Sequence, residues 1–233
     1  MKIKVIMCNS SPEFYAAHAA RRAALSKDDM QLTVVNIPHG PESLESAYDE
    51  ALAAPYVLQQ VVSAEAEGYD AVVIDCASDP ALRAAREISE LPVVSAGESS
   101  YYAAMLVAAK FSVVTSVRTA VNELREHVQM YGIEDRVASV RSADVPVLEL
   151  NNSAVAEEYL YRAAKKAVEE DGAQAIVLGC TGMMAMREKL EQRLGIPVIE
   201  PHTAAVECAA MLVHMKLRQS RLSYIKAGNK KYN

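Results

Sequence analysis

The sequence predicts an α/β fold with two pseudo-symmetric domains, each a roughly four-stranded parallel sheet flanked by helices. Short β-branched runs alternate with alanine-rich stretches of helical periodicity, which is typical of βαβ units. The segment DAVVIDC at 70–76 recurs as QAIVLGC at 174–180, and each copy is followed by a helical stretch and then by LPVV or IPVI. We therefore expect two similar halves, with the active site in the cleft between them.

The individual elements follow from hydrophobic periodicity. Strands are expected at 3–7, 32–37, 71–75, 92–96, 111–116, 136–140, 175–179 and 197–200. Helices are expected at 50–67, 79–90, 99–110, 118–131, 153–171, 183–194 and 203–219. Asp79 with the proline after it, Ser99 and Asn152 are residues that suit helix starts.

The internal repeat sets the expected domain boundaries. We place the first half at 1–97 and the second at 98–202, with a C-terminal helix within 203–233 packing back on the first half. Ligands of open parallel sheets bind outside the carboxyl ends of the strands. Both repeated cysteines, Cys76 and Cys180, lie at that end of their strands.

Composition narrows the class of partner. The chain has 233 residues, of which 51% are hydrophobic, and a net charge of −6 with its basic residues dispersed. That distribution disfavours nucleic acid and anionic membranes as partners. No apolar stretch approaches the length of a signal sequence core or a membrane span, so we expect a cytoplasmic protein acting on a small-molecule substrate.

Four cysteines, at 8, 76, 180 and 208, show no CxxC pairing and no ligand-like spacing with the five histidines. Neither disulfides nor a metal site is therefore expected, and the thiols are taken as free. Phosphate-binding glycine loops are also missing from the sequence, so no cofactor is expected. Cys8 and Cys208 are interpreted as core residues.

Cys76 and Cys180 differ from the other two because each closes a strand and precedes an expected helix N-terminus, which favours a thiolate. In repeated positions they should face one another across the cleft. One thiolate could then remove a proton from carbon while the opposite thiol delivers one to the other face, which is racemisation without a cofactor. A Cys–His nucleophile is an alternative, and His202 is the only histidine with a plausible cleft position.

Polar or small residues near the strand ends are expected to bind the substrate. Hydroxyl and amide groups after the first strand and after its repeat partner can donate to carbonyl oxygens, and backbone N–H groups after each cysteine can stabilise an oxyanion. Ser43 is either a helix cap or a substrate contact. The expected binding residues are Asn9, Ser10, Ser11, Ser43, Ala77, Ser78, Thr115, Thr181, Gly182 and His202.

Several segments in order along the chain carry a family resemblance. VIMCNSS, GPESLESAYDEALAAP, DAVVIDCASDPALRAARE, FSVVTSVRT, AIVLGCTGMM and GIPVIEPHTAAVE resemble the aspartate/glutamate/hydantoin racemase superfamily, and within it the hydantoin and allantoin racemase branch. The resemblance implies two pseudo-symmetric domains, with Cys76 and Cys180 as catalytic acid and base. The CASD and GCTG segments differ from the Cys–Asn–Thr–Ala and Gly–Cys–Thr–His/Glu patterns usual in the amino-acid racemases.

The sequence also departs from the family pattern. Met7 and Cys8 stand where the family commonly has Asn–Pro, and 200–202 reads Glu–Pro–His where it commonly has Asp–Gly–Val. We expect a racemase of a 5-substituted hydantoin or of allantoin. The alternatives are a racemase or isomerase of an acyclic amino or carboxylic acid, which Glu200 and His202 encourage, and a non-catalytic small-ligand binding protein. Apolar helix faces such as YYAAMLVAA lead us to expect a homo-oligomer.

Overall fold

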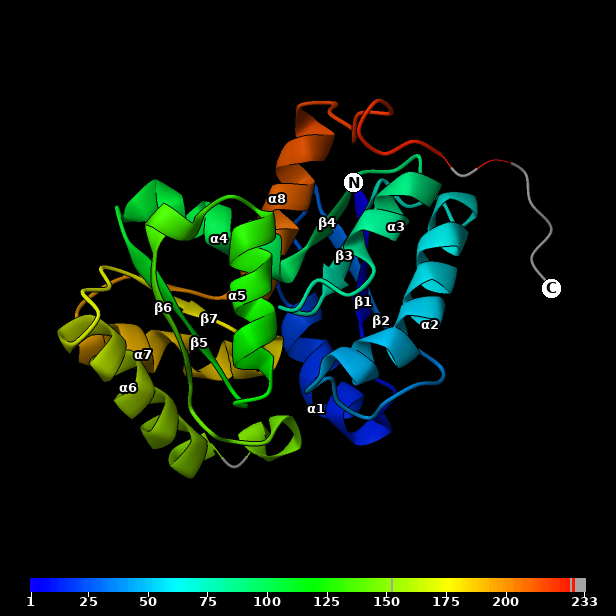
Figure 1. The fold of residues 1–233 in the computed structure, drawn as a ribbon. Helices are drawn as coiled ribbons and strands as arrows, with labels where there is room; N and C mark the ends of the chain where they lie inside the picture. Colours follow the sequence, from blue (N-terminus) through cyan, green and yellow to red (C-terminus); the bar gives the residue numbers. More distant parts are fainter. Residues whose placement is uncertain (152, 227, 229–233) are drawn as a thin grey trace.

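The computed structural model describes residues 1–151, 153–226 and 228, and it consists of two four-stranded parallel sheets (Figure 1). The first sheet has the order β2-β1-β3-β4, with strands β1 (Lys2–Met7), β2 (Gln31–Asn36), β3 (Ala71–Asp75) and β4 (Val93–Ser95). The second has the order β6-β5-β7-β8, with strands β5 (Phe111–Thr115), β6 (Val137–Ser142), β7 (Ile176–Leu178) and β8 (Val198–Ile199). The predicted fold class is confirmed.

The sequence repeat is also a repeat of topology and pairing. In each half the first strand of the unit lies centrally and pairs in parallel with the strand that ends at a cysteine loop, β1 with β3 and β5 with β7. Val5 lies opposite Val73, and Val113 lies opposite Val177. Every residue of β3 and β5 is buried, as expected for parallel strands covered on both faces.

Helices cover both sheets. Their bounds are α1 (Pro12–Ala23), α2 (Ala47–Ala66), α3 (Leu82–Ile88), α4 (Ala96–Val107), α5 (Ala120–Met130), α6 (Ser153–Glu169), α7 (Arg187–Leu194) and α8 (Pro201–His214). Short 3₁₀ helices occupy Glu134–Arg136, Val147–Asn151 and Thr181–Met186. Asn152, expected as a helix start, lies outside the described residues. No helix in the described part of the chain has both the length and the apolarity to cross a membrane.

Helix α1 is not among the elements that periodicity predicted. Its buried positions are Phe14, His18 and Arg22, so two of the three residues facing the core are polar and the apolar pattern is weak. The helix begins at Pro12 after the N-cap Ser11, whose hydroxyl oxygen accepts a hydrogen bond from the Phe14 N–H at 3.1 Å. Hydrophobic periodicity therefore did not predict this helix, because a cationic side chain occupies one of its buried positions.

Asp79 does not start the helix that follows it. Helix α3 begins at Leu82, after Ala81 in the left-handed region with φ 58°. The Asp79 carboxylate instead accepts hydrogen bonds from the N–H groups of Gly97 and Glu98, both at 2.8 Å, and so caps α4. A Cβ on Gly97 would lie 2.2 Å from the Ala77 carbonyl oxygen, so this close approach requires glycine.

Two expected boundaries around these elements were wrong. Helix α4 starts at Ala96, so Ser99 lies inside the helix. The C-terminal helix, expected to run to 219, ends at His214.

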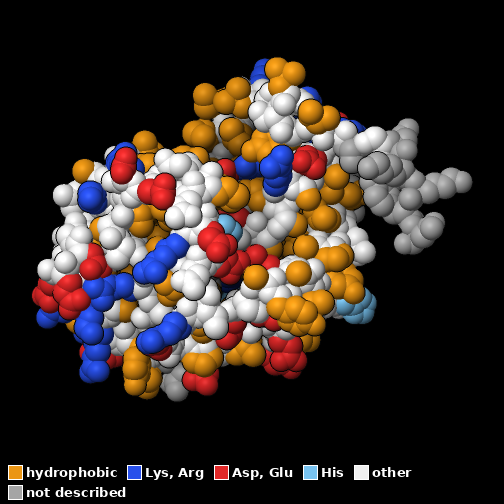
Figure 2. Space-filling model, in the orientation of Figure 1, with side chains coloured by type: hydrophobic (Ala, Val, Ile, Leu, Met, Phe, Trp, Pro, Cys, Tyr) orange, Lys and Arg blue, Asp and Glu red, His pale blue; other side chains and the backbone are white. Residues whose placement is uncertain are grey.

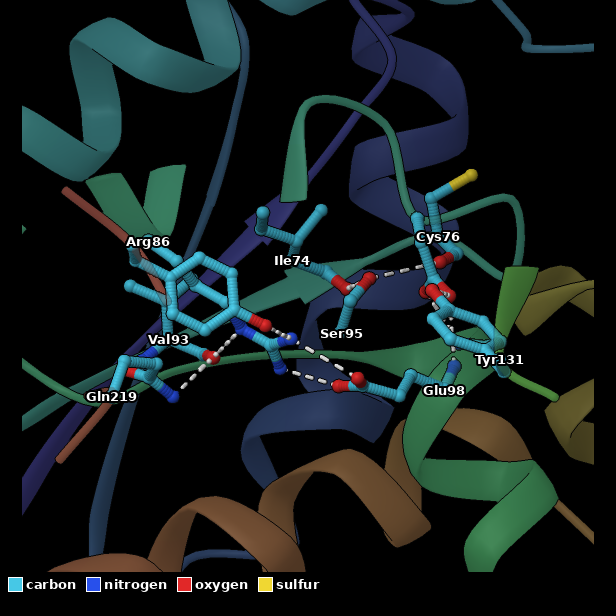
Figure 3. A network of polar contacts seen from close by, with 11 residues as sticks. Ile74, Cys76, Arg86, Val93, Ser95, Glu98, Tyr131 and Gln219 are labelled. Carbon is cyan, nitrogen blue, oxygen red and sulfur yellow. Dashed lines mark hydrogen bonds and ion pairs between the residues drawn. The ribbon is translucent and has the colours of Figure 1, made fainter. Parts of the chain in front are cut away.

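Helix α8 packs against α4 and β3, and the residues after it run beside the edge strand β4 and helix α3. Gln219 and Val93 exchange two hydrogen bonds of 3.0 Å, one through the Val93 N–H and one through its carbonyl (Figure 3). Arg86 donates to Glu98 at 3.0 Å and to the hydroxyl of Tyr224 at 3.2 Å. Residues 219–224 are thus held against the first half by polar contacts.

The largest apolar cluster joins the two halves. It contains Val5 and Val73 from the first sheet, Val114 and Leu178 from the second, and Val206 from α8. Separate clusters lie under α2 and α3 on the first sheet and under α4 and α5 on the second. Because this apolar cluster includes residues of both sheets, it fixes how the strand ends of the first sheet are oriented relative to those of the second.

Candidate active site

A pocket lies at the carboxyl ends of the strands and takes its lining from both halves. Cys76 follows β3 and Cys180 follows β7, and both line this pocket. Figure 2 shows acidic side chains gathered near the middle of the molecular face, and the pocket lining includes four acidic residues. The full lining is Cys8, Asn9, Phe14, Ser43, Leu44, Glu45, Glu50, Asp75, Cys76, Ala77, Ser78, Thr115, Ser116, Val117, Ala120, Glu123, Leu124, Val147, Gly179, Cys180, Thr181 and Gly182.

Cys76 is half-buried, and its Sγ lies 3.3 Å from the hydroxyl oxygen of Ser78. Hydrogen bonds from the Cys8 thiol and from the hydroxyl and backbone N–H of Ser78 lower the pKa of Cys76, against the opposing effect of burial. Burial and the hydrogen bond to Cys76 raise the pKa of Cys8 well above its usual value. The Cys8 thiol, whose Sγ also lies 3.5 Å from the Ile6 carbonyl oxygen, therefore favours the thiolate form of Cys76.

Cys180 has the opposite tendency. Burial, with a smaller contribution from Cys76, raises its pKa to about 12, although a hydrogen bond from the Gly182 N–H acts in the other direction. Gly179, just before it, is needed because a Cβ there would lie 2.9 Å from Cα and Cβ of Thr115. The pair thus combines one thiol whose pKa is lowered with one whose pKa is raised.

The local source of thiolate stabilisation differs from the expected helix N-terminus. Helix α3 begins only at Leu82, and Cys180 is followed by a 3₁₀ turn. Each sulfur instead accepts a hydrogen bond from the N–H two residues further along, that of Ser78 for Cys76 and that of Gly182 for Cys180. The two halves repeat this contact.

The structure brings seven of the expected binding residues into the pocket lining: Asn9, Ser43, Ala77, Ser78, Thr115, Thr181 and Gly182. Asn9 is 9% exposed, and its Oδ1 has no hydrogen-bond partner among the described residues. Ser43 lines the pocket, whereas Ser46 is the N-cap of α2 and accepts from the Asp49 N–H at 3.3 Å. The hydroxyl of Thr115 donates to the Gly179 carbonyl at 3.2 Å, which fixes its orientation.

Three expected residues lie outside the lining. The Ser10 hydroxyl donates to the Gly40 carbonyl at 2.7 Å, and Ser11 caps α1. His202 is fully buried at the start of α8, with Nδ1 3.1 Å from Asp75 Oδ1. Because its ring pairs with a carboxylate rather than with a thiol, the Cys–His arrangement is not formed.

Four carboxyl groups in the pocket lining were not anticipated, those of Glu45, Glu50, Asp75 and Glu123, and the pair Glu50 and Glu123 joins the two halves. Glu50 comes from α2 in the first half and Glu123 from α5 in the second. Burial, a hydrogen bond with Glu123 and the charge of Cys76 raise the pKa of Glu50 to about 10, so that Glu50 is a neutral acid near pH 7. No sequence pattern singled out Glu50 or Glu123, since each is an acidic residue in an early helical turn.

The ionisable side chains in the pocket lining, apart from the thiols, are all acidic. The lining includes three glutamates and one aspartate but no lysine, arginine or histidine. Within 1–151, 153–226 and 228, no group of three or more His, Cys, Asp or Glu side chains is placed to hold a metal ion. The groups available for proton transfer in this pocket are thiols and carboxyls.

Comparison with known proteins gives consistent relationships. Residues 3–209 match the family model described as Asp/Glu/Hydantoin racemase. The hydantoin racemase of Pseudomonas sp. (strain NS671) is 42% identical, over 99% of this chain and 93% of that protein, and the hydantoin racemase of Paenarthrobacter aurescens is 37% identical over all of both chains. The structure of allantoin racemase from Klebsiella pneumoniae has a TM-score of 0.94 at 33% identity, covering 100% of this chain and 96% of the other.

The family match covers most of the chain and includes both cysteine loops, and the relatives exceed 30% identity over nearly their full lengths. The chain therefore belongs to the Asp/Glu/hydantoin racemase family.

Proposed function

We propose that this protein is a cofactor-independent racemase that interconverts the D- and L-forms of a 5-substituted hydantoin or of allantoin. One observation carries the proposal: two thiols from equivalent strand ends of the two halves line a single pocket that lacks cationic side chains. Such a pair can transfer protons on opposite faces of one carbon.

In the proposed reaction the Cys76 thiolate removes the proton from C5 of one enantiomer. The electron pair of the broken C–H bond moves to the neighbouring carbonyl oxygen, giving an enolate. Cys180 then donates its proton to the opposite face of C5, and the carbonyl re-forms. The thiolate now resides on Cys180, which serves as the base for the other enantiomer, so no proton or electron is gained or lost.

The ionisation tendencies of the two thiols support this assignment. The lowered pKa of Cys76 favours the thiolate that acts as base, and the raised pKa of Cys180 keeps that thiol protonated as the acid. Cys8 contributes by donating a hydrogen bond to Cys76. In the reverse direction the Gly182 N–H favours the thiolate form of Cys180.

The pocket favours a neutral ring over an amino acid as substrate. Recognition of a free carboxylate usually uses arginine or lysine, and none lines this pocket. A hydantoin ring offers N–H donors and carbonyl acceptors, which suit the carboxyl, amide and hydroxyl groups present. Glu200, which encouraged the acyclic-acid alternative, instead caps α8 by accepting from the N–H groups of His202 and Thr203, each at 2.8 Å.

The expectations of no cofactor, a cytoplasmic location and self-association stand as parts of this proposal. In the described part of the chain, all four cysteines are free, which accords with a reducing compartment. The proposed steps use only protein groups, so activity should persist after dialysis against a chelator.

Hydrogen exchange in heavy water tests the reaction and separates it from ligand binding alone. Cys76→Ala and Cys180→Ala should each abolish racemisation of pure D- or L-substrate, measured by polarimetry, with a loss of at least about 10³-fold. Each should still exchange the C5 hydrogen of one enantiomer with retention, as followed by proton NMR, and the two variants should act on opposite enantiomers.

Cys208→Ala is the matched control, because Cys208 is a half-buried thiol on α8 outside the pocket lining. This variant should racemise at the wild-type rate. Racemisation at a near wild-type rate by either pocket variant would contradict the two-thiol scheme. Wild-type protein that leaves the C5 hydrogen in place would instead support a binding protein.

A further inference from the structure

A single buried arginine connects the two cysteine loops. Arg22, on α1, has no exposed surface. Its Nε donates to Oδ2 of Asp75, the residue just before Cys76, and its Nη2 donates to the carbonyl oxygen of Thr181, the residue just after Cys180, at 3.1 Å. One planar guanidinium therefore joins groups one residue away from each thiol.

Further hydrogen bonds close this connection into a network. The Thr181 hydroxyl donates to the Asp75 carbonyl at 3.3 Å, which links the two loops directly. The second carboxylate oxygen of Asp75 lies 3.1 Å from Nδ1 of His202. Asp75 is thus held by an arginine and a histidine, and these contacts lower its pKa despite its burial. The aspartate is ionised and rigidly placed.

The guanidinium also acts on Cys180 through its charge. The groups that influence this sulfur are the Gly182 N–H, the Ser116 hydroxyl and Arg22, which favour the thiolate, and Cys76, which opposes it. Burial has the larger effect and keeps the pKa of Cys180 raised, so Arg22 opposes it only in part, although the pocket lining itself includes no cationic side chain. Fork geometry lets arginine hold two acceptors at once, which lysine does not reproduce.

We propose that Arg22 is the positioning residue of the two-thiol site: it holds the Cys76 and Cys180 loops at a fixed separation and places its positive charge beside the Cys180 loop, against the Thr181 carbonyl. Arg22 itself does not line the pocket. The expected effect of Arg22 on catalysis rests on the proposed racemase function. The expected effect of Arg22 on the ionisation of Cys180 does not depend on the substrate.

Two variants separate position from charge. Arg22→Lys keeps the charge but loses the two-acceptor geometry, so kcat for racemisation should fall about tenfold, with KM within about threefold of wild type. The combined Arg22→Gln, Asp75→Asn variant removes both charges without leaving either one unpaired, and kcat should fall about 100-fold. Arg21→Gln, which alters the exposed neighbour on the same helix, is the matched control and should be neutral.

The charge effect is read from alkylation of Cys180, followed by mass spectrometry across pH in a Cys76→Ala background. The alkylation profile of Cys180 should move to higher pH in the charge-free pair and remain near that of the background in Arg22→Lys. If Arg22 had only a structural role, the alkylation profile of Cys180 would not differ in this way between the charge-free pair and Arg22→Lys. Far-UV and near-UV circular dichroism identify folded variants, and if the charge-free pair does not fold, the kcat of Arg22→Lys decides the positioning role.

Wild-type kcat in Arg22→Lys, or an unmoved Cys180 profile in a folded charge-free pair, would overturn the proposal. Failure of the proposed function is distinguishable from either result. In that case the wild-type protein would not racemise hydantoins or allantoin, while the alkylation profiles of Cys180 would still report the effect of Arg22.

Discussion

The two pocket thiols differ in their hydrogen-bond partners, and this difference determines which one should react first. Cys76 accepts from Cys8 and from both the hydroxyl and N–H of Ser78, whereas burial dominates at Cys180. Cys8 was expected only as a core residue. It does pack with Ile6 and Ile74 in the core of the first half, but it also lines the pocket.

Alkylation of the wild-type protein at pH 7 should therefore modify Cys76 at least about tenfold faster than Cys180, because the thiolate is the reacting form. Iodoacetamide labelling with peptide mass spectrometry measures both rates, and bound substrate should slow the reaction at Cys76. Cys208, whose pKa is raised by burial, serves as the internal reference. Faster labelling of Cys180 or Cys208 would reverse the proposed assignment of base and acid.

At the scale of elements, the Asp79 carboxylate fixes the start of α4 beside the Cys76 loop. It accepts from the N–H groups of Gly97 and Glu98 and from the Tyr131 hydroxyl at 2.7 Å, so it ties the loop to α4 and α5. Asp79 is itself left-handed, with φ 51°, in the turn after Cys76. This turn is stabilised by contacts from other elements rather than by its own helix.

Asp79→Ala leaves three donors without their acceptor and should lower the free energy of unfolding by about 3 kcal/mol, or about 1 kcal/mol for each. Urea unfolding followed by circular dichroism gives this value. Tyr131→Phe removes only one of the three hydrogen bonds and should cost about 1 kcal/mol. Equal losses in the two variants would show that the cap on α4 contributes nothing.

Helices α2 and α5 bring Glu50 and Glu123 together in the pocket, and the pH dependence of stability should report this contact. The pKa of Glu50 rises from 4.5 to about 10 through burial, Glu123 and Cys76. Between these values the unfolded chain has lost the proton and the folded chain retains it. Stability therefore falls as pH rises through this window.

Glu50→Gln removes this titration, so its melting temperature should exceed that of wild type at pH 8 and approach it near pH 4. Differential scanning calorimetry across pH measures the difference. Glu65→Gln, at an exposed position on the same helix, should leave the pH profile unchanged. A Glu50→Gln profile parallel to wild type throughout would mean that Glu50 ionises normally in the fold.

At the scale of the whole molecule, exposed apolar side chains on two helices favour self-association, which stays a prediction. Helices α4 and α8 pack together, and they expose Leu106 at 88%, Val107 at 58% and Met211 at 49%. We expect sedimentation equilibrium to give an oligomer and Leu106→Glu to shift it toward the monomer, since a buried unpaired charge opposes association. The exposed Glu65→Gln should leave the mass unchanged, and a monomeric wild type would contradict the prediction.

The sequence alone determined the two-sheet α/β fold and singled out Cys76 and Cys180. Both depend on signals that are local in the chain: β-branched runs, helical periodicity, and a repeated strand ending in cysteine. Seven of ten expected binding residues also lie in the pocket, because residues that follow parallel strands collect at one edge of a sheet. Ser10, Ser11 and His202 also follow strands in the sequence. Their side chains bond instead to the Gly40 carbonyl, the Phe14 N–H and Asp75, and these three residues lie outside the pocket lining.

Only the tertiary structure decided the contacts that tune the site. Arg22 bridges Asp75 and Thr181, residues far from it in the chain, and its helix lacks an apolar face that periodicity could detect. Glu50 meets Glu123 across the two halves in the same way. Burial of a charged group is stable only when a specific partner lies opposite, and that partner is set by the packing of two sheets rather than by any local pattern.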